Sequence, residues 1–480
     1  MTSSYRRLPQ IAARLAPSCR SGDRCDHEAG TGGDNLPARG FCHTHIVCSA
    51  GLARAGRKSG RLWDSGQRLS LVHKGTKCGL YGAAGAAIAL VAWYPGHWLI
   101  VLIVLPAVWS TAASRCCSLS LWGGYYLTGA RDIPLVCERF FVGHGELFAN
   151  AAIASGVAFW LGQAILLSAP WALLTPRTNA GRRTWRVVVA TLLVSVPPLG
   201  MIGWLSPLHV ASALFPGWQL AGLTLGVCAL GTAAGVWRSK VAPIIGVLLT
   251  AAAMVAHSFS QRPEGPTGWV AVNTSFGRLD QRDYDALYKR TEAVRATADR
   301  QFELGARVVV LPEEVIGLWR PSTRYWWSRY LEPLARTDRT LVLGVDLGDR
   351  ESLRGHSDNE DYSLTYTDSA VVLGAGHGRF DSRQPVPAGL WRPWANVSAT
   401  PGHVMQGYLH LAGRRAAFSI CYEDFLWWPH WRLLVDRPDV FVGMSNEWFS
   451  ADLALANIQQ QSAESIAKLA GVPLLRAMNR

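Results

Sequence analysis

The chain has 480 residues, a formal net charge of +13 and a mean hydropathy of +0.11, with 49% hydrophobic residues. One soluble domain is not expected to be this apolar over this length, so more than one structural unit is predicted. Residues 1–256 hold 22 Lys and Arg against 8 Asp and Glu, whereas residues 257–480 hold 25 against 26. Because the positive excess lies in the head and between apolar segments, the pattern is typical of a membrane protein and argues against a nucleic-acid partner.

The ten cysteines form no CxxC pair and show no zinc-ligand spacing. They predict neither a disulfide framework nor a metal site, and nothing in the chain indicates a cofactor.

Residues 1–74 form a basic head that is rich in Arg, Ser and Gly and has no sustained hydrophobic period. It lacks the single apolar core of a signal peptide, so we expect it to be unstructured and to stay in the cytoplasm. An alternative is that it is upstream sequence added to the protein by its gene model.

Apolar segments occupy residues 75–257, and several approach the roughly 20 residues that cross a bilayer. They cover residues 78–94, 98–113, 119–128, 148–174, 187–205, 210–237 and 241–256. The third is short enough to be re-entrant, and a soluble helical core is the alternative to membrane spans. Seven crossings place the basic residues at 115, 177–186, 238 and 240 on the side of the head, and everything after about residue 257 outside. We therefore predict an inner-membrane protein with seven spans and a periplasmic C-terminal domain.

Strands alternate with helices over the C-terminal domain, residues 268–480, which predicts a layered α/β fold. Strands are expected at residues 269–274, 306–314, 340–347, 364–376, 408–423 (a hairpin) and 440–448. Helices are expected at residues 284–302 and 453–470, the latter ending at a glycine.

Cys421 follows the apolar run at residues 416–420 and is the only cysteine after Cys228. A thiol at the end of a buried strand can be presented to a substrate, but its acidic neighbours Glu423 and Asp424 do not lower its pKa, so a nucleophile here needs a base or a cation from elsewhere. The alternative is an inert core cysteine.

Glu313 stands at the mouth of a second apolar strand, where Pro312 ends the run VVVL. A carboxylate in a largely apolar site has a raised proton affinity and can accept a thiol proton near neutral pH. Glu314 is an alternative base, and a solvated acid without a catalytic role is the other interpretation. Asn446 and Glu447 follow a later strand and are expected to border the site.

The order LPE, PVP and ICYE, at residues 311–313, 385–387 and 420–423, resembles the nitrilase (carbon–nitrogen hydrolase) superfamily. The apolar region resembles that of apolipoprotein N-acyltransferase. The phrases YTDSAVVLGAG, RQPVPAGLWRPW and VPLLRAMNR are most similar to TraB-type conjugal transfer proteins. The resemblance covers residues 75–480 and implies an αββα sandwich that carries the catalytic residues on loops at strand ends.

The family's catalytic set is Glu, Lys and Cys. The resemblance implies Glu313 as general base, Cys421 as nucleophile and Glu423 as supporting acid. It also implies an acyl-thioester formed from a lipid or amide donor and resolved by an amine or water. The lysine is replaced: in FDSRQPVP, Ser382 occupies its place and Arg383 is the neighbour. Arg383 is a candidate for the missing charge, although it cannot shuttle a proton, and a purely structural arginine is the alternative.

Three functional interpretations follow. The first is a cysteine-dependent acyltransferase or amidase of a plasmid conjugal transfer system, and the second is a catalytically inactive scaffold with the same fold. Expected partners are membrane lipids and proteins of the conjugation or pilus-assembly apparatus. A transporter is disfavoured because the apolar segments hold few ionisable groups. Five tryptophans are candidates to line an acyl-chain cleft or to serve as core anchors, namely Trp391, Trp394, Trp427, Trp428 and Trp431. Relatives continue past the position of Arg480, so either this branch is shorter or the chain is truncated.

Overall fold

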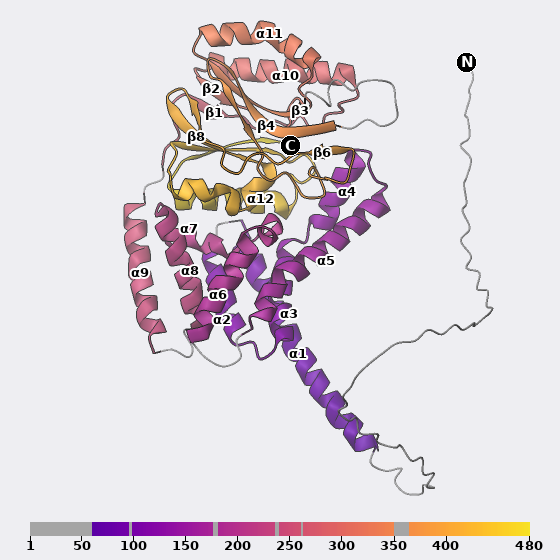
Figure 1. The fold of residues 1–480 in the computed structure, drawn as a ribbon, viewed down its shortest axis with the longest axis vertical. Helices are drawn as coiled ribbons and strands as arrows, with labels where there is room; N and C mark the ends of the chain where they lie inside the picture. Colours follow the sequence, from indigo (N-terminus) through magenta and orange to yellow (C-terminus); the bar gives the residue numbers. More distant parts are fainter. Residues whose placement is uncertain (1–59, 96–97, 176–180, 236–239, 261–262, 350–363) are drawn as a thin grey trace, which may run out of the picture. The chain divides into compact units, whose positions relative to one another are not determined.

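The computed structural model describes residues 60–95, 98–175, 181–235, 240–260, 263–349 and 364–480 (Figure 1). Most of the predicted head, residues 1–59, lies outside the described residues. The first helix, α1 (Gly60–Ala92), begins inside the segment that the sequence analysis assigned to the head.

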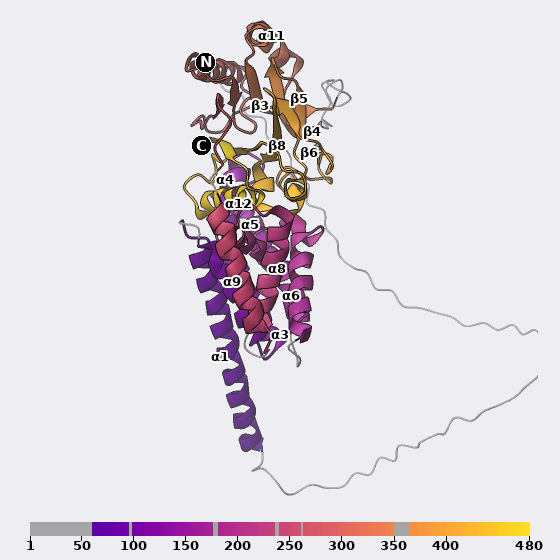
Figure 2. The same ribbon diagram turned by 90° about the vertical axis from the view of Figure 1, so that its left-hand side faces the viewer.

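Helices make up the chain from α1 to residue 259. They are η1 (Leu99–Ile103), α2 (Val104–Ser110), α3 (Arg115–Gly129), α4 (Ile133–Gly143), α5 (Ala149–Leu173), α6 (Gly181–Ser195), η2 (Leu199–Ile202), η3 (Pro207–His209), α7 (Val210–Leu214), α8 (Gln219–Gly235) and α9 (Ala242–Phe259). Figure 2 shows α6, α8 and α9 side by side. Helix α4 lies in a stretch where the sequence analysis predicted no element.

The prediction of seven spans is wrong. Within the described residues three helices are long and apolar enough to cross a membrane: Gly75–Ala92 of α1, α5 and α9. A fourth crossing results only if Pro207–Leu214 and Gln219–Gly235, which meet at 118°, count as one broken span. The other apolar helices are too short, because the hydrocarbon core needs about 20 helical residues. Leu99–Ser110 starts as a 3₁₀ turn, and α6 ends before two successive prolines.

Close backbone contact joins α1 to α3. A Cβ added at Gly85 would lie 1.9 Å from the carbonyl oxygen of Leu121, and one at Gly124 would lie 2.2 Å from that of Gly82. Only glycine permits this approach, as is common between membrane helices. The short α3 is therefore held by packing, and its Trp122 stacks on Trp171 of α5 with ring centroids 3.7 Å apart.

Two sheets form the C-terminal domain. The strands are β1 (Trp269–Ala271), β2 (Val308–Val310), β3 (Thr340–Gly348), β4 (Leu364–Gly374), β5 (Gly378–Asp381), β6 (Val397–Ala399), β7 (Leu409–Leu411), β8 (Arg414–Ile420), β9 (Val440–Asn446) and β10 (Leu474–Asn479). The first sheet has the order β1-β2-β3-β4-β5, with β6 paired to β4, and the second has the order β10-β9-β8-β7. The strands β1, β2 and β3 are parallel, as are β8, β9 and β10.

The sheets pack face to face, and helices cover their outer faces (Figure 1). Val310 and Val342 of the first sheet share a core with Phe418 and Val442 of the second. Helices α10 (Tyr284–Glu303) and α11 (Pro321–Arg336) pack on the outer face of the first sheet. Helix α12 (Ala454–Ala470) packs between the second sheet and α7. This arrangement is the αββα sandwich that the resemblance implied.

Phe418 provides a test of the two-sheet core. Its ring is 1% exposed and stacks on Phe380 of the opposite sheet at 5.7 Å between centroids. Truncation to alanine leaves a cavity between the sheets, so we expect Phe418→Ala to lower the free energy of unfolding by about 3–5 kcal/mol. Thermal denaturation in detergent measures this effect, and Tyr325→Ala, at a side chain 72% exposed on α11, is the control. Equal melting temperatures for the two variants would contradict the assigned core.

Candidate active site

Cys421 lies at the turn where β8 runs into the 3₁₀ helix η4 (Cys421–Phe425). Its φ of +48° is in the left-handed region, which is uncommon for a residue with a side chain. Such strained residues cluster at active sites, where the surrounding structure holds them in place. The thiol is half-buried and lines a cavity, so it is not sealed in the core.

Glu313 meets this thiol from the first sheet. It follows β2 and is 3% exposed, and its carboxyl group acts directly on the Cys421 thiol, whose proton affinity it raises. The backbone N–H of Asn446, at the end of β9, donates to Glu313 Oε2 at 2.7 Å. Glu313 and Cys421, which are 108 positions apart in the sequence, thus come together at the ends of their strands.

Glu314, the alternative base, points elsewhere. Its φ is +50°, and its carboxylate accepts hydrogen bonds from Gln281 Nε2 at 3.1 Å and Asn446 Nδ2 at 3.3 Å. The left-handed turn thereby sends two adjacent glutamates in different directions, and Glu313 is the one at the thiol.

Two further buried acids come from neighbouring strands. Asp346 of β3 and Asp368 of β4 are partners in the antiparallel register, and the carboxyl groups of Asp368 and Glu313 act on each other. Burial raises the pKa of Glu313 to about 8 and raises the pKa values of Asp346 and Asp368 well above their usual range. Neither aspartate could be predicted from the sequence, because only the pairing of the strands brings them to the site.

The thiol of Cys421 also has a pKa raised well above its usual value, first by burial and then by the negative charge of Glu313. At neutral pH the resting group is therefore the thiol. A reaction through sulfur requires that the proton leave as the bond forms, and Glu313 is the group placed to accept it.

Arg383 forms a buried ion pair with Glu423. Its Nη2 lies 2.9 Å from Glu423 Oε2, and its guanidinium also donates to the carbonyl oxygens of Phe418 and Pro429. Glu423 in turn accepts backbone hydrogen bonds from residues 383 and 384 and, at 3.4 Å, from Ile420. The pair joins the segment of residues 382–384 to the turn that presents Cys421.

This geometry bears on two predicted roles. Glu423 is placed to support the nucleophile by fixing its turn. Arg383, a candidate for the missing catalytic charge, has its guanidinium bound to Glu423 and to carbonyl oxygens, and no contact joins it to Glu313 among the described residues. The geometry favours its structural alternative, and a catalytic role for it stays a prediction.

Ser382, the residue in the predicted lysine position, lies next to Asp368. Its backbone N–H donates to the carbonyl oxygen of Asp368 at 2.8 Å, and the residue is 1% exposed. Its hydroxyl has no hydrogen-bond partner in the described part of the chain.

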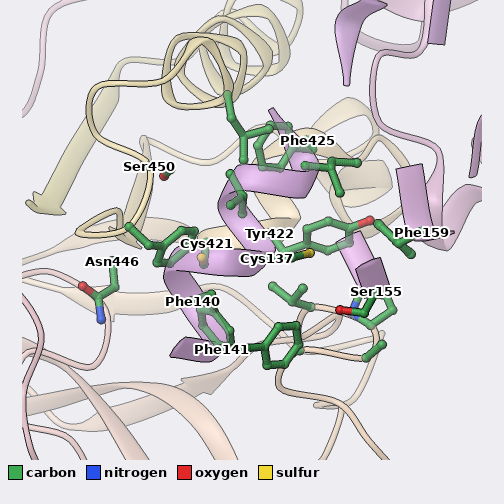
Figure 3. A pocket seen from close by; sticks show the side chains of 18 of the residues that line it. Cys137, Phe140, Phe141, Ser155, Phe159, Cys421, Tyr422, Phe425, Asn446 and Ser450 are labelled. Atoms are coloured by element: carbon green, nitrogen blue, oxygen red, sulfur yellow. The ribbon is translucent and has the colours of Figure 1, made fainter. Parts of the chain in front are cut away.

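A cavity of about 600 Å³ opens at Cys421 and is lined mainly by apolar side chains. Figure 3 shows Cys137, Phe140 and Phe141 of α4 gathered on the same cavity as Cys421 and Tyr422. The cavity continues along Phe159 and Ser155 of α5, which is itself a candidate membrane span. The volume lies within the about 300–1,000 Å³ that is typical of ligand pockets.

The cavity lining differs from the sequence-based expectation. None of the five candidate tryptophans belongs to it: Trp427 and Trp428 pack in hydrophobic cores, and Trp394 is 74% exposed. Asn446 does border the cavity, whereas Glu447 binds Arg476 at 3.0 Å. The run IPLVCERFFVG of α4 was missed. Its apolar residues at helical spacing were the signal that could have identified it.

Helix α4 is fixed to the C-terminal domain by side chains around the cavity. Arg139 binds Asp452 at 2.5 Å, and Glu146, in the loop after α4, binds Arg392 at 2.6 Å. Phe140 packs edge-on against Phe449. The apolar wall and the thiol therefore belong to one continuous site.

The raised pKa of Glu313 predicts a pH dependence. The base is competent only when ionised, and burial places its pKa at about 8, so the rate of acylation of Cys421 should rise with pH up to about pH 8. Glu313→Gln should remove this rise and slow the reaction. The measurement is the rate of p-nitrophenolate release from a p-nitrophenyl ester between pH 5 and 9, with the rate of Cys421→Ala subtracted. A rate that falls over this range, or the same profile in Glu313→Gln, would refute the assignment.

Comparisons with known proteins agree with the resemblance. No family model matches the chain. It is 28% identical over 415 residues to the conjugal transfer protein TraB of Agrobacterium fabrum, covering 82% of this chain and 90% of that protein. A TraB-type protein of Sinorhizobium fredii is 27% identical, with 82% and 96% covered. An apolipoprotein N-acyltransferase of Bordetella bronchiseptica is 25% identical over 333 residues, with 62% and 56% covered.

Two solved structures with partial similarity are nitrilase-type enzymes. A mutant of the Nesterenkonia AN1 amidase from the nitrilase superfamily is 15% identical with a TM-score of 0.31, covering 45% of this chain and 78% of that one. A carbon–nitrogen hydrolase of Helicobacter pylori G27 is 13% identical with a TM-score of 0.30, covering 44% and 72%. By its sequence, the chain is similar to the TraB conjugal transfer proteins and, over a shorter part of its length, to apolipoprotein N-acyltransferases.

Proposed function

We propose that this protein is a cysteine-dependent acyltransferase of a plasmid conjugal transfer system, anchored in the inner membrane and acting at its periplasmic face. The observation that carries the proposal is the Cys421 thiol, which interacts with the buried carboxyl of Glu313 and opens to a mainly apolar cavity. The similarity to TraB proteins supports the conjugal context, and the weaker similarity to N-acyltransferases supports the reaction class.

The geometry suits a two-step acyl transfer. Glu313 accepts the thiol proton as the sulfur of Cys421 attacks the donor's carbonyl carbon. The tetrahedral intermediate collapses, the leaving oxygen or nitrogen of the donor takes the proton back from Glu313, and an acyl-thioester remains on Cys421. An amine or water then gives a proton to Glu313 and attacks the thioester; the C–S bond breaks, the sulfur takes that proton from Glu313, and the acylated amine or the free acid leaves.

The cavity suggests an acyl donor with a long hydrocarbon chain. Its walls come from α4 and α5, and α5 is one of the three candidate spans. A chain that enters from the bilayer can follow this apolar path to the sulfur without passing through water. Membrane lipids are accordingly the proposed donors, and burial of the chain supplies the binding free energy.

Charge supports the proposed orientation. The basic head should remain in the cytoplasm, and α1, α5 and α9 as three crossings place the C-terminal domain on the opposite side. The same three crossings put Arg186 and Lys240, which precede α9, on the side of the head, provided that α7 and α8 form a re-entrant pair.

A scaffold without catalytic activity is the second candidate. It is favoured by Ser382 in the lysine position and by the commitment of Arg383 to Glu423. In that case the sandwich would dock onto proteins of the conjugation or pilus-assembly apparatus, and the thiol would be a remnant.

Covalent labelling of the protein in membranes distinguishes the two candidates. We expect a long-chain p-nitrophenyl ester to acylate Cys421, and peptide mass spectrometry identifies the modified residue. Glu313→Gln should slow this acylation by at least about 100-fold, which is the lower end of the range for loss of a general base. Cys137→Ala removes another thiol of the same cavity and should leave labelling intact. Plasmid-transfer frequency should fall in Cys421→Ala. Full transfer by that variant, or labelling that is unaffected by Glu313→Gln, would establish the scaffold.

A further inference from the structure

The acid pair behind the nucleophile is more than a solvated cluster. Glu313 and Asp368 are 3% and 2% exposed, and each carboxyl group shifts the proton affinity of the other. Two buried carboxyl groups that act on each other this strongly repel each other when both are ionised, so one of them is expected to retain a proton. That proton would lie between the end of β2 and β4.

The other described titratable groups around the pair are acids, a thiol and a phenol. The titratable side chains that act on it from neighbouring elements are Glu314 after β2, Asp346 of β3, Tyr366 of β4, and Cys421 and Glu423 of η4. The described arginines nearby bind other groups: Arg383 binds Glu423, Arg392 binds Glu146, and Arg476 binds Asp424 and Glu447. No described cation contacts Glu313 or Asp368, so a proton is the charge that compensates the pair.

Two buried polar atoms at the acid pair form no hydrogen bond within the described part of the chain. Oδ1 of Asp368 and the hydroxyl of Ser382 are both buried and have no hydrogen-bond partner among the described residues. The two residues are joined by a backbone hydrogen bond between β4 and the end of β5. The resemblance puts Ser382 in the position of the family lysine, so the backbone hydrogen bond joins Asp368 to that position.

We propose that Asp368 stays protonated and donates its O–H to Glu313, and so replaces the absent lysine in favouring the ionised form of that base next to the thiol. Asp368 is then a positioning residue, since it acts on the reaction through Glu313. The inference rests on the proposed role of Glu313 as base. It explains how a site can lose its lysine and keep its chemistry: a neutral donor favours the charged form of its acceptor, as an ammonium does, without adding a buried cation.

Two isosteric variants test the proposal through the pH midpoint of Cys421 acylation. Asp368→Asn keeps an N–H donor and should leave the midpoint near its wild-type value. Asp368→Leu has no donor, so the pKa of Glu313 should rise and the midpoint should move up by about one pH unit. Ser382→Lys introduces a cation and should move it down by a similar amount.

The direction of the shift decides the outcome. An Asp368 that is ionised in the wild type would raise the pKa of Glu313 by repulsion, so Asp368→Leu and Asp368→Asn would both lower the midpoint and overturn the proposal. A residue needed only for folding would change the amplitude of acylation and leave the midpoint in place, which would also overturn it. An upward shift in Asp368→Leu alone supports it.

Infrared spectroscopy separates this proposal from the proposed function, because it requires no turnover. Wild-type protein at pH 7 should show the carbonyl stretch of a buried carboxylic acid that is lost in Asp368→Asn and retained in Asp436→Asn, an exposed acid paired with Arg415. If the band is lost only in Asp368→Asn while no ester acylates Cys421, the proposed acyltransferase function is wrong but the protonation of Asp368 is supported. If the spectra of wild type and Asp368→Asn coincide, Asp368 is ionised and the proposal falls.

Discussion

The contact between the Cys421 thiol and the Glu313 carboxyl is the interaction on which the site depends, and it exists only because two sheets pack face to face. β2 brings the acid and β8 brings the sulfur, each at the end of a strand. The core between them fixes their separation. Burial then raises the proton affinity of both groups, so that the resting thiol keeps its proton and the carboxylate can accept it as sulfur reacts.

The charged residues around that contact form two pairs with different roles. Arg383 and Glu423 form a closed ion pair that holds the nucleophile's turn, and removal of either partner would leave a buried charge without compensation. Glu313 and Asp368 form an acid pair that can hold a proton. The substitution of lysine by Ser382 therefore does not leave an empty site, because the neighbouring strand already supplies a group with a proton to donate. Helix α4 adds the apolar wall and ties the site to the helical region.

Sequence reasoning identified what depends on local pattern. Apolar runs with sharp ends located β2 and β8, and the residues at those ends proved to be neighbours in space. The hairpin of β7 and β8 and helices α10 and α12 were also predicted. Asp346 and Asp368 were missed because they lie inside strands and reach the site through antiparallel register. The number of spans was wrong because hydropathy alone cannot show that α2, α3 and α6 are interrupted or short. The direction of Arg383 was likewise set by tertiary packing.

The most direct test of the account is the chemical state of Cys421 in protein isolated from its own membranes without any added donor. Peptide mass spectrometry before and after hydroxylamine should find a fraction of Cys421 carrying a long-chain acyl group that hydroxylamine removes, with more of it in a preparation depleted of acceptor amines. Cys137 in the same cavity should be unmodified. A Cys421 that is always the free thiol, with the same result for Cys137, would contradict the claim that this contact serves acyl transfer.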